Sequence, residues 1–151
     1  MSEIQLAGRV AVVTGAGQGM GRAIAQRLAS GGAKVAALDL NFEQAQESVA
    51  GCVDPSVCMA YACNVSDSSA VNETFAAVEA TLGPVSILVN NAGIGRAPGD
   101  GSDQMYELMG KRNEEIANGE EPKTHVDHIA FMEDEGWRGV MGVNLDGAFY
   151  C

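Results

Sequence analysis

The first 93 residues alternate between two hydrophobic patterns. Four short apolar runs, rich in β-branched residues, have the character of strands buried on both faces: 9–15, 34–40, 57–65 and 84–93. Three intervening segments repeat their apolar residues every three to four positions, as helices do: 19–30, 41–50 and 66–83. The alternation of strand and helix with short links predicts an α/β protein with a parallel sheet, right-handed crossovers and helices on both faces.

Beyond residue 93 the pattern is helical and polar. Residues 102–117 place apolar side chains at helical spacing, which predicts a helix with Ser102 as its cap. Apolar residues from Trp137 to Phe149 predict one further helix, still unfinished at Cys151. Because no Gly or Asn follows to cap that helix, we expect the sequence to be the first part of a longer protein.

Composition narrows the class of protein. The chain has 151 residues, of which 46% are hydrophobic and 19% charged, as in a globular domain. No apolar run has the length of a membrane span, and the N-terminus lacks the pattern of a secretory signal. The four cysteines have no C-x-x-C spacing. We therefore expect a cytoplasmic protein without a membrane partner, whose cysteines are reduced thiols that are buried or idle.

The negative charge is concentrated in one segment. The net charge is −11, and residues 100–135 hold eleven Asp and Glu against three Lys and Arg. Such a surface repels phosphate backbones, so we expect no nucleic-acid partner. Residues 97–130 are interpreted as an acidic helical insertion. It is either a lid that shapes a substrate pocket or a solvated, outward helix that contacts solvent or another subunit.

Candidate chemistry begins at TGAGQGMG, residues 14–21, between the first strand and the first helix. The spacing that fits is G-x-x-x-G-x-G, formed by Gly15, Gly19 and Gly21. The G-x-G-x-x-G alternative fails at Met20, and an NTPase phosphate loop fails because Arg22 follows the last glycine. Such a loop before a helix N-terminus predicts a diphosphate site, although a tight strand-to-helix turn has the same composition.

An acidic residue supports the dinucleotide interpretation. Asp39 lies at the end of the second predicted strand, 18 residues after Gly21. An acid at this place accepts hydrogen bonds from ribose hydroxyls and repels a 2′-phosphate. Leu40 and Asn41 follow it, where an NADP site would place Arg or Lys. The sequence therefore predicts NAD as the cofactor.

The motifs TGAGQGMG, CNV, NNAG and VNLDGAF occur in this order on the expected elements. In these motifs the chain resembles the short-chain dehydrogenase/reductase family. The resemblance implies a Rossmann-like doubly wound sheet, here partial with strand order 3-2-1-4, in a dinucleotide-binding domain over residues 1–151 that is truncated at its C-terminus. It also implies an oxidoreductase that uses NAD on a small-molecule secondary alcohol or ketone, and a homo-oligomeric complete enzyme, a dimer or tetramer.

The same resemblance assigns roles to single residues. Those implied to bind the cofactor lie at the carboxyl ends of the four strands: Gly15, Gln18, Gly19, Met20, Gly21, Asp39, Leu40, Asn64, Val65, Asn91, Ala92 and Gly93. Asn64 stands where the family usually has Asp, and its carbonyl oxygen is expected to accept from the adenine amino group. Asn144 is implied to be catalytic, because in the family this Asn holds a water of the proton relay.

One family feature is missing. The catalytic Tyr and Lys occupy Y-x-x-x-K, but no Lys lies four residues after Tyr61, Tyr106 or Tyr150. The chain as given is therefore expected to hold cofactor without turnover. Two alternatives stay open: a non-catalytic NAD-binding module, and a methyltransferase that uses S-adenosylmethionine. His125 and His128 have no further ligand set near them, so no metal is expected.

Overall fold

The computed structural model describes residues 6–151 and divides into two compact units. The first unit joins the described residues up to Gly93 to the segment Val143–Cys151. The second unit is Ile94–Gly142 and contains the predicted acidic insertion. The sheet that organises the candidate site belongs entirely to the first unit.

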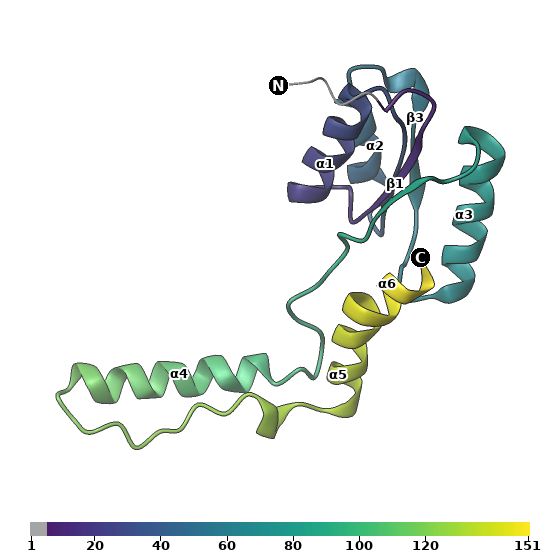
Figure 1. Cartoon of the computed structure of the whole chain (residues 1–151). Coiled ribbons are helices and arrows are strands. Elements are labelled where there is room, and N and C mark those ends of the chain that lie inside the picture. Colours follow the sequence, from purple (N-terminus) through teal and green to yellow (C-terminus); the bar gives the residue numbers. More distant parts are fainter. Residues whose placement is uncertain (1–5) are drawn as a thin grey trace. The chain divides into compact units, whose positions relative to one another are not determined.

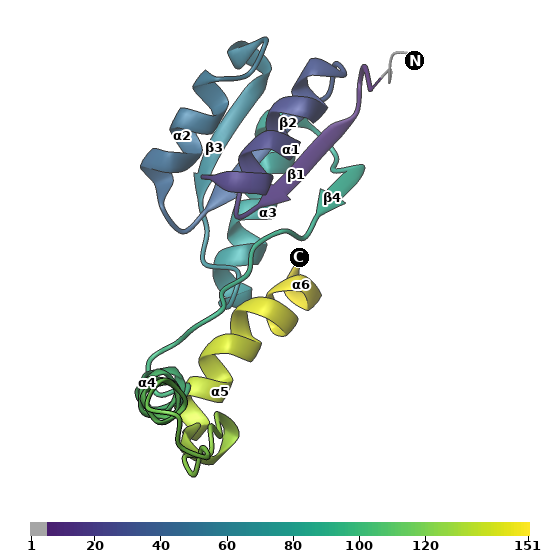
Figure 2. The same ribbon diagram turned by 90° about the vertical axis from the view of Figure 1, so that its left-hand side faces the viewer.

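The sheet has four parallel strands in the order β3-β2-β1-β4, as predicted. The strands are β1 (Val10–Thr14), β2 (Lys34–Asp39), β3 (Cys58–Ala62) and β4 (Ile87–Val89). Figure 2 shows them side by side, with β3 and β4 outermost. Every residue of β1 is buried, which agrees with its continuous apolar sequence.

Three helices cover the two faces of this sheet (Figures 1 and 2). They are α1 (Gly19–Ser30), α2 (Phe42–Ala50) and α3 (Ser68–Leu82). The side chain of Asn41 caps α2 and that of Asp67 caps α3, each by accepting from backbone N–H groups of the first turn. The expected α/β architecture, with helices on both faces, is thus confirmed.

Alternate strand residues build two separate cores. Odd positions of β1, such as Ala11 and Val13, pack with α1 and α2. Even positions, such as Val12, pack with α3 and with residues of the C-terminal segment. This division follows from the two-residue period of a strand, which sends neighbouring side chains to opposite faces. Burial on both faces fixes the strand register that places the carboxyl ends together.

Several predicted elements differ in extent from the observed ones. The third strand begins only at Cys58, because Asp54 turns the chain into a short 3₁₀ helix, η1 (Pro55–Val57), by accepting from the Ser56 N–H. The fourth strand is only three residues long. These boundaries depend on side-chain hydrogen bonds and on the pairing of strands. The spacing of hydrophobic residues gives no information on either.

The expected single C-terminal helix is interrupted. It consists of α5 (Asp134–Met141), a π-helical turn η3 (Gly142–Asp146) and α6 (Gly147–Tyr150). Asn144 lies within the π turn. Such turns widen a helix locally and are frequent at functional sites. α6 lies beside α3 in both views (Figures 1 and 2).

The second unit is a helix with a return segment. Its long helix α4 spans Ser102–Ala117, as predicted, and a 3₁₀ turn η2 (Ile129–Phe131) precedes α5. The expected cap is wrong, because Ser102 is the first helical residue and Gly101 occupies the N-cap position without a side-chain bond. The carboxylate of Asp100 instead accepts from the Ser102 N–H at 2.8 Å.

The cysteines are free thiols, as expected. Cys52, Cys58 and Cys63 are buried. Burial raises the pKa of Cys52 to about 12, with a further contribution from the neighbouring Cys58, so this thiol stays neutral near pH 7. Within residues 6–151, no helix combines the length and apolar character that crossing a membrane requires.

Candidate functional site

The glycine-rich loop leaves the end of β1 and opens directly into α1. Gln18, Gly19 and Met20 are exposed at this turn. No side chain caps the N-terminus of α1, so its first N–H groups face outward with the positive end of the helix dipole. Gly19 has φ of +52°, and a Cβ built there meets nothing within 4 Å, so the space above the helix is open. This geometry fits a diphosphate.

Asp39 is bonded to the same loop from the end of β2. Its Oδ2 accepts from the Gly17 N–H at 2.8 Å, and its Oδ1 accepts from the Asn41 N–H at 2.9 Å. A carboxylate has about four acceptor positions, so roughly two remain for hydroxyl donors. A Cβ on residue 17 would lie 2.7 Å from Asp39 Oδ2, which makes Gly17 necessary for this contact.

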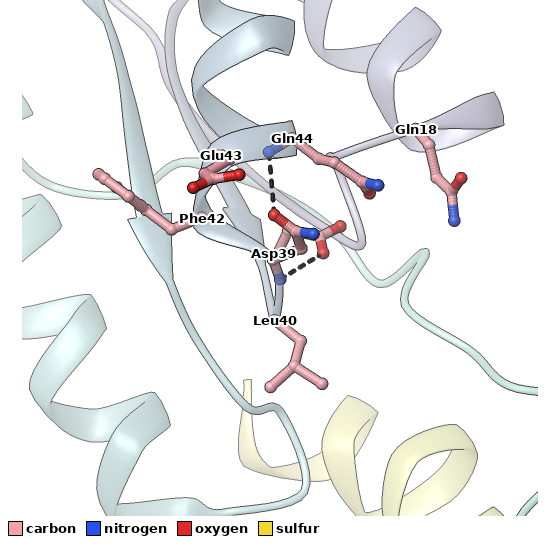
Figure 3. A pocket seen from close by; sticks show the side chains of 7 residues that line it. Gln18, Asp39, Leu40, Phe42, Glu43 and Gln44 are labelled. Carbon is pink, nitrogen blue, oxygen red and sulfur yellow. Dashed lines mark hydrogen bonds between the residues drawn. The ribbon is translucent and has the colours of Figure 1, made fainter.

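A pocket lies beside Asp39 (Figure 3). Its lining comes from the loop, the end of β2 and the first turn of α2: Gln18, Asp39, Leu40, Asn41, Phe42, Glu43 and Gln44. Leu40 is 76% exposed and extends from the strand end on the side away from Gln44 (Figure 3). The pocket therefore combines an exposed apolar side chain with a carboxylate acceptor, as a nucleoside requires.

A buried polar group fixes the loop from behind. Ser48 of α2 is fully buried, and its Oγ donates to the Ala16 carbonyl at 2.7 Å. The same Oγ accepts from Arg22 Nε at 2.9 Å, and this nitrogen also donates to the Gly17 carbonyl at 3.0 Å. Arg22 forms an ion pair with Glu47 at 3.0 Å. Sequence reasoning missed these roles, because a helical Ser and an Arg carry no motif.

The turn after β4 supports the loop from the other side. The Thr14 hydroxyl accepts from the N–H groups of Asn91 and Ala92 at 3.1 and 3.0 Å. The Asn91 side chain donates to the carbonyls of Thr14 and Gly15 at 3.0 and 3.1 Å. The structure thus brings the NNAG turn against the glycine loop. Both the Asn91 side-chain amide and the N–H groups of Asn91 and Ala92 are therefore used to support the loop.

The remaining predicted residues divide between surface and interior. Asn64 is exposed at the end of β3, whereas the Val65 side chain is 7% exposed and belongs to the core under α3. Gly21 is buried, and a Cβ there would lie 2.1 Å from the Gly15 carbonyl oxygen. Gly21 therefore serves the close packing of helix and loop, and the Val65 side chain serves the core.

Asn144 meets the same strand edge. A Cβ on residue 93 would lie 2.9 Å from Asn144 Oδ1, so the glycine at position 93 makes room for this side chain. Asn90 donates from Nδ2 to the Ala148 carbonyl at 3.3 Å, which ties the end of β4 to α6. The π turn and the NNAG turn are thereby held together within the first unit.

The family follows from comparison with known sequences. The model of the family described as short chain dehydrogenase matches residues 9–151. The chain belongs to the short-chain dehydrogenase family. The relatives of this family that resemble it are oxidoreductases, and the Rossmann-like fold observed here agrees with theirs.

Individual relatives give the extent of the likeness. The chain is 42% identical over 143 residues to 2,3-dihydro-2,3-dihydroxybenzoate dehydrogenase of Bacillus subtilis strain 168, covering 94% of this chain and 44% of that protein. It is 42% identical over 90 residues to human 15-hydroxyprostaglandin dehydrogenase [NAD(+)]. That match covers 58% of this chain and 34% of the human protein. A solved structure of 3-ketoacyl-(acyl-carrier-protein) reductase from Brucella melitensis, complexed with NADH, superposes with a TM-score of 0.70 at 29% identity. The superposition covers 97% of this chain and 48% of the reductase. The chain thus spans less than half the length of these short-chain dehydrogenases.

His125 and His128 both lie in the second unit. Among residues 6–151, no three His, Cys, Asp or Glu side chains are grouped so that they could hold a metal ion. His128 Nε2 instead lies 3.5 Å from Ser102 Oγ in the second unit.

Proposed function

We propose that this chain is the NAD-binding portion of an oxidoreductase that acts on a secondary alcohol or a ketone. The observation that carries the proposal is the contact between Asp39 and the Gly17 N–H, which joins the end of β2 to the glycine loop at 2.8 Å. This contact supports the proposal, because it holds the Asp39 carboxylate beside the loop that opens α1, as a ribose acceptor next to a diphosphate site requires. NAD bound there would accept a hydride from a carbinol carbon or, once reduced, return it to a carbonyl carbon.

The residues of the site favour NAD over NADP. The Asp39 carboxylate offers acceptors to two ribose hydroxyls and repels a 2′-phosphate. The guanidinium of Arg22 is engaged by the Gly17 carbonyl, Ser48 and Glu47. It therefore does not supply the cation that a 2′-phosphate needs. The NAD(+) in the name of the human relative and the NADH in the Brucella complex agree with this proposal.

We infer that the proton transfer that accompanies hydride transfer depends on groups that residues 1–151 do not supply. No Tyr here is followed by Lys four residues later. We therefore propose that residues 1–151 bind NAD without turnover, and that Asn144 positions a water for the proton path of the complete enzyme. Asn144 suits that role because the π turn holds it beside Gly93 at the strand edge. A module that binds NAD without any catalysis is the second candidate, and the same site supports it.

Calorimetric titration of the chain with NAD, NADP and S-adenosylmethionine tests the proposal. We expect NAD to bind at least about tenfold more tightly than NADP, a difference of about 1.4 kcal/mol, and S-adenosylmethionine to show no saturable binding. Asp39→Asn should weaken NAD binding and reduce the preference for NAD over NADP, because it removes the negative charge and one hydrogen-bond acceptor. Glu73→Gln, an exposed change on α3, is the control for net charge. Equal affinities for NAD and NADP would contradict the assignment of Asp39.

A further inference from the structure

A purine attached to a ribose held by Asp39 would extend from the end of β2 toward the end of β3. The diphosphate site is at β1 and the ribose acceptor at β2, and the next strand in the sheet is β3. Asp39 pairs with Ala62 in the strand register, and the Cys63 N–H donates to the Asp39 carbonyl at 2.9 Å. Adjacent strands lie about 4.8 Å apart, so Asn64 follows within reach of a base.

The hydrogen bonds of Asn64 determine which end of its side-chain amide faces Ser66. Its Oδ1 accepts from the Ser66 N–H at 3.1 Å and from the Ser66 hydroxyl at 2.8 Å. A backbone N–H can only donate, so the carboxamide oxygen must face Ser66 and the NH₂ group must face away from it. Two donors occupy both lone pairs of that oxygen. The acceptor that the sequence suggested for the adenine amino group is therefore already in use.

We propose that Asn64 presents a hydrogen-bond donor, and no acceptor, to the base of the dinucleotide. In adenine, the acceptor that meets Asn64 Nδ2 is N1. In hypoxanthine, the acceptor is the 6-oxo oxygen, which replaces the 6-amino group. An Asp at this position would instead offer a second carboxylate oxygen to the 6-amino donor. The chain thus binds the base without requiring its amino group, so its cofactor specificity extends to 6-oxopurine dinucleotides. This inference rests on the proposed NAD site.

Titration of the chain with NAD and with nicotinamide hypoxanthine dinucleotide measures the polarity directly. For the natural chain we expect the two Kd values to agree within about threefold, since each base supplies one acceptor. Asn64→Asp should bind NAD at least about fivefold more tightly than the hypoxanthine dinucleotide, because one exposed hydrogen bond contributes about 1 kcal/mol. The Asp carboxylate still accepts from Ser66, so the turn is retained.

Two further variants separate polarity from charge and from local structure. Ser66→Ala keeps the backbone N–H but removes the hydroxyl, which frees one lone pair of Asn64 Oδ1. The backbone N–H still holds Asn64 Oδ1 toward residue 66, so the NH₂ group keeps facing the base and the ratio of the two Kd values should stay near one. Asn72→Asp adds the same charge at an exposed position of α3 and should leave the ratio of the two Kd values unchanged.

The outcomes distinguish this inference from the function on which it rests. If the natural chain binds NAD but rejects the hypoxanthine dinucleotide by tenfold, and Asn64→Asp does not change that ratio, the donor assignment is overturned while NAD binding stands. If neither dinucleotide binds any variant, the NAD site itself fails and the inference falls with it. If the two Kd values of the natural chain are nearly equal and Asn64→Asp shifts the preference toward NAD, both the NAD site and the donor assignment of Asn64 are supported.

Discussion

At the scale of single residues, the site depends on close approach between backbone and carboxylate. Gly17 is buried, and its N–H points at Asp39. Any side chain at residue 17 would begin 2.7 Å from Asp39 Oδ2 and 2.9 Å from the Gln44 Cβ. A side chain at position 17 would thus meet steric conflict, although Gly17 is not one of the three glycines of the G-x-x-x-G-x-G motif.

Gly17→Ala should destabilise the first unit by about 1–3 kcal/mol, because the added methyl group forces Asp39 and Gln44 apart. It should also weaken NAD binding by displacing the ribose acceptor. Urea unfolding and titration measure the two effects. The same substitution in an Asp39→Ala background should cost less, since the truncated side chain makes room. Equal costs in both backgrounds would show that Asp39 is not the residue displaced.

Ser48 supports the loop through one buried hydroxyl. Ser48→Ala leaves the Ala16 carbonyl without its 2.7 Å donor and takes one acceptor from Arg22. We expect a loss of about 1–3 kcal/mol in the free energy of unfolding, the cost of an unsatisfied buried polar group. Denaturant unfolding checks it. Ser69→Ala, at an exposed position of α3, is the matched control and should stay within about 0.5 kcal/mol of the natural chain.

At the scale of elements, carboxylates hold the second unit together. Asp100, 4% exposed, accepts from the N–H groups of Ser102 at 2.8 Å and Ala97 at 2.9 Å. Glu115 on α4 accepts from the Thr124 hydroxyl at 2.7 Å and from two N–H groups of the return segment. These bonds join α4 to the chain on either side of it. The acidic composition of this segment therefore has a structural use.

The start of α4 should respond to acid through Asp100. Hydrogen bonds from Ser102 and Ala97 lower the pKa of this carboxyl from 3.8 to about 2. A lowered folded pKa means that the stabilisation is present above pH 3.8 and is lost as pH falls through about 2. NMR of the Ser102 amide, titrated from about pH 4 to about one unit below the lowered pKa, measures the transition. Asp100→Asn should abolish it, whereas Glu121→Gln, an exposed change nearby, should not.

At the scale of the whole chain, the sheet and the acidic helical unit are separate compact bodies. The two segments of the first unit are in contact where the second unit is inserted between them. A Cβ built on Gly93 would lie 2.9 Å from Asn144 Oδ1. The two chain ends that bound the second unit therefore meet within the first. All residues proposed to hold NAD belong to that first unit.

Replacing residues 97–139 with a Gly-Ser linker of about six residues should leave the first unit folded, since closing so short a gap costs little chain entropy. We expect the Kd for NAD to stay within about threefold of that of the natural chain. Titration and urea unfolding of the deletion variant provide the measurement. A tenfold loss of affinity would assign part of the cofactor site to the second unit.

The sequence by itself determined the architecture and the family. Continuous apolar runs and helical spacing specify which residues must be buried, so strand order and helix faces followed from hydrophobic pattern and motif together. The glycine spacing and Asp39 located the candidate site for the same reason. Each of these features is carried by residue type at fixed intervals along the chain.

Only the tertiary structure decided how polar groups are shared. The support of the loop by Ser48, the space requirement at Gly17 and the π turn around Asn144 arise from contacts between distant segments. Whether Asn64 offers an acceptor or a donor depends on what Ser66 has already taken. A hydrogen-bonding group has a fixed number of lone pairs and protons, and which partners use them is settled only when the chain has folded.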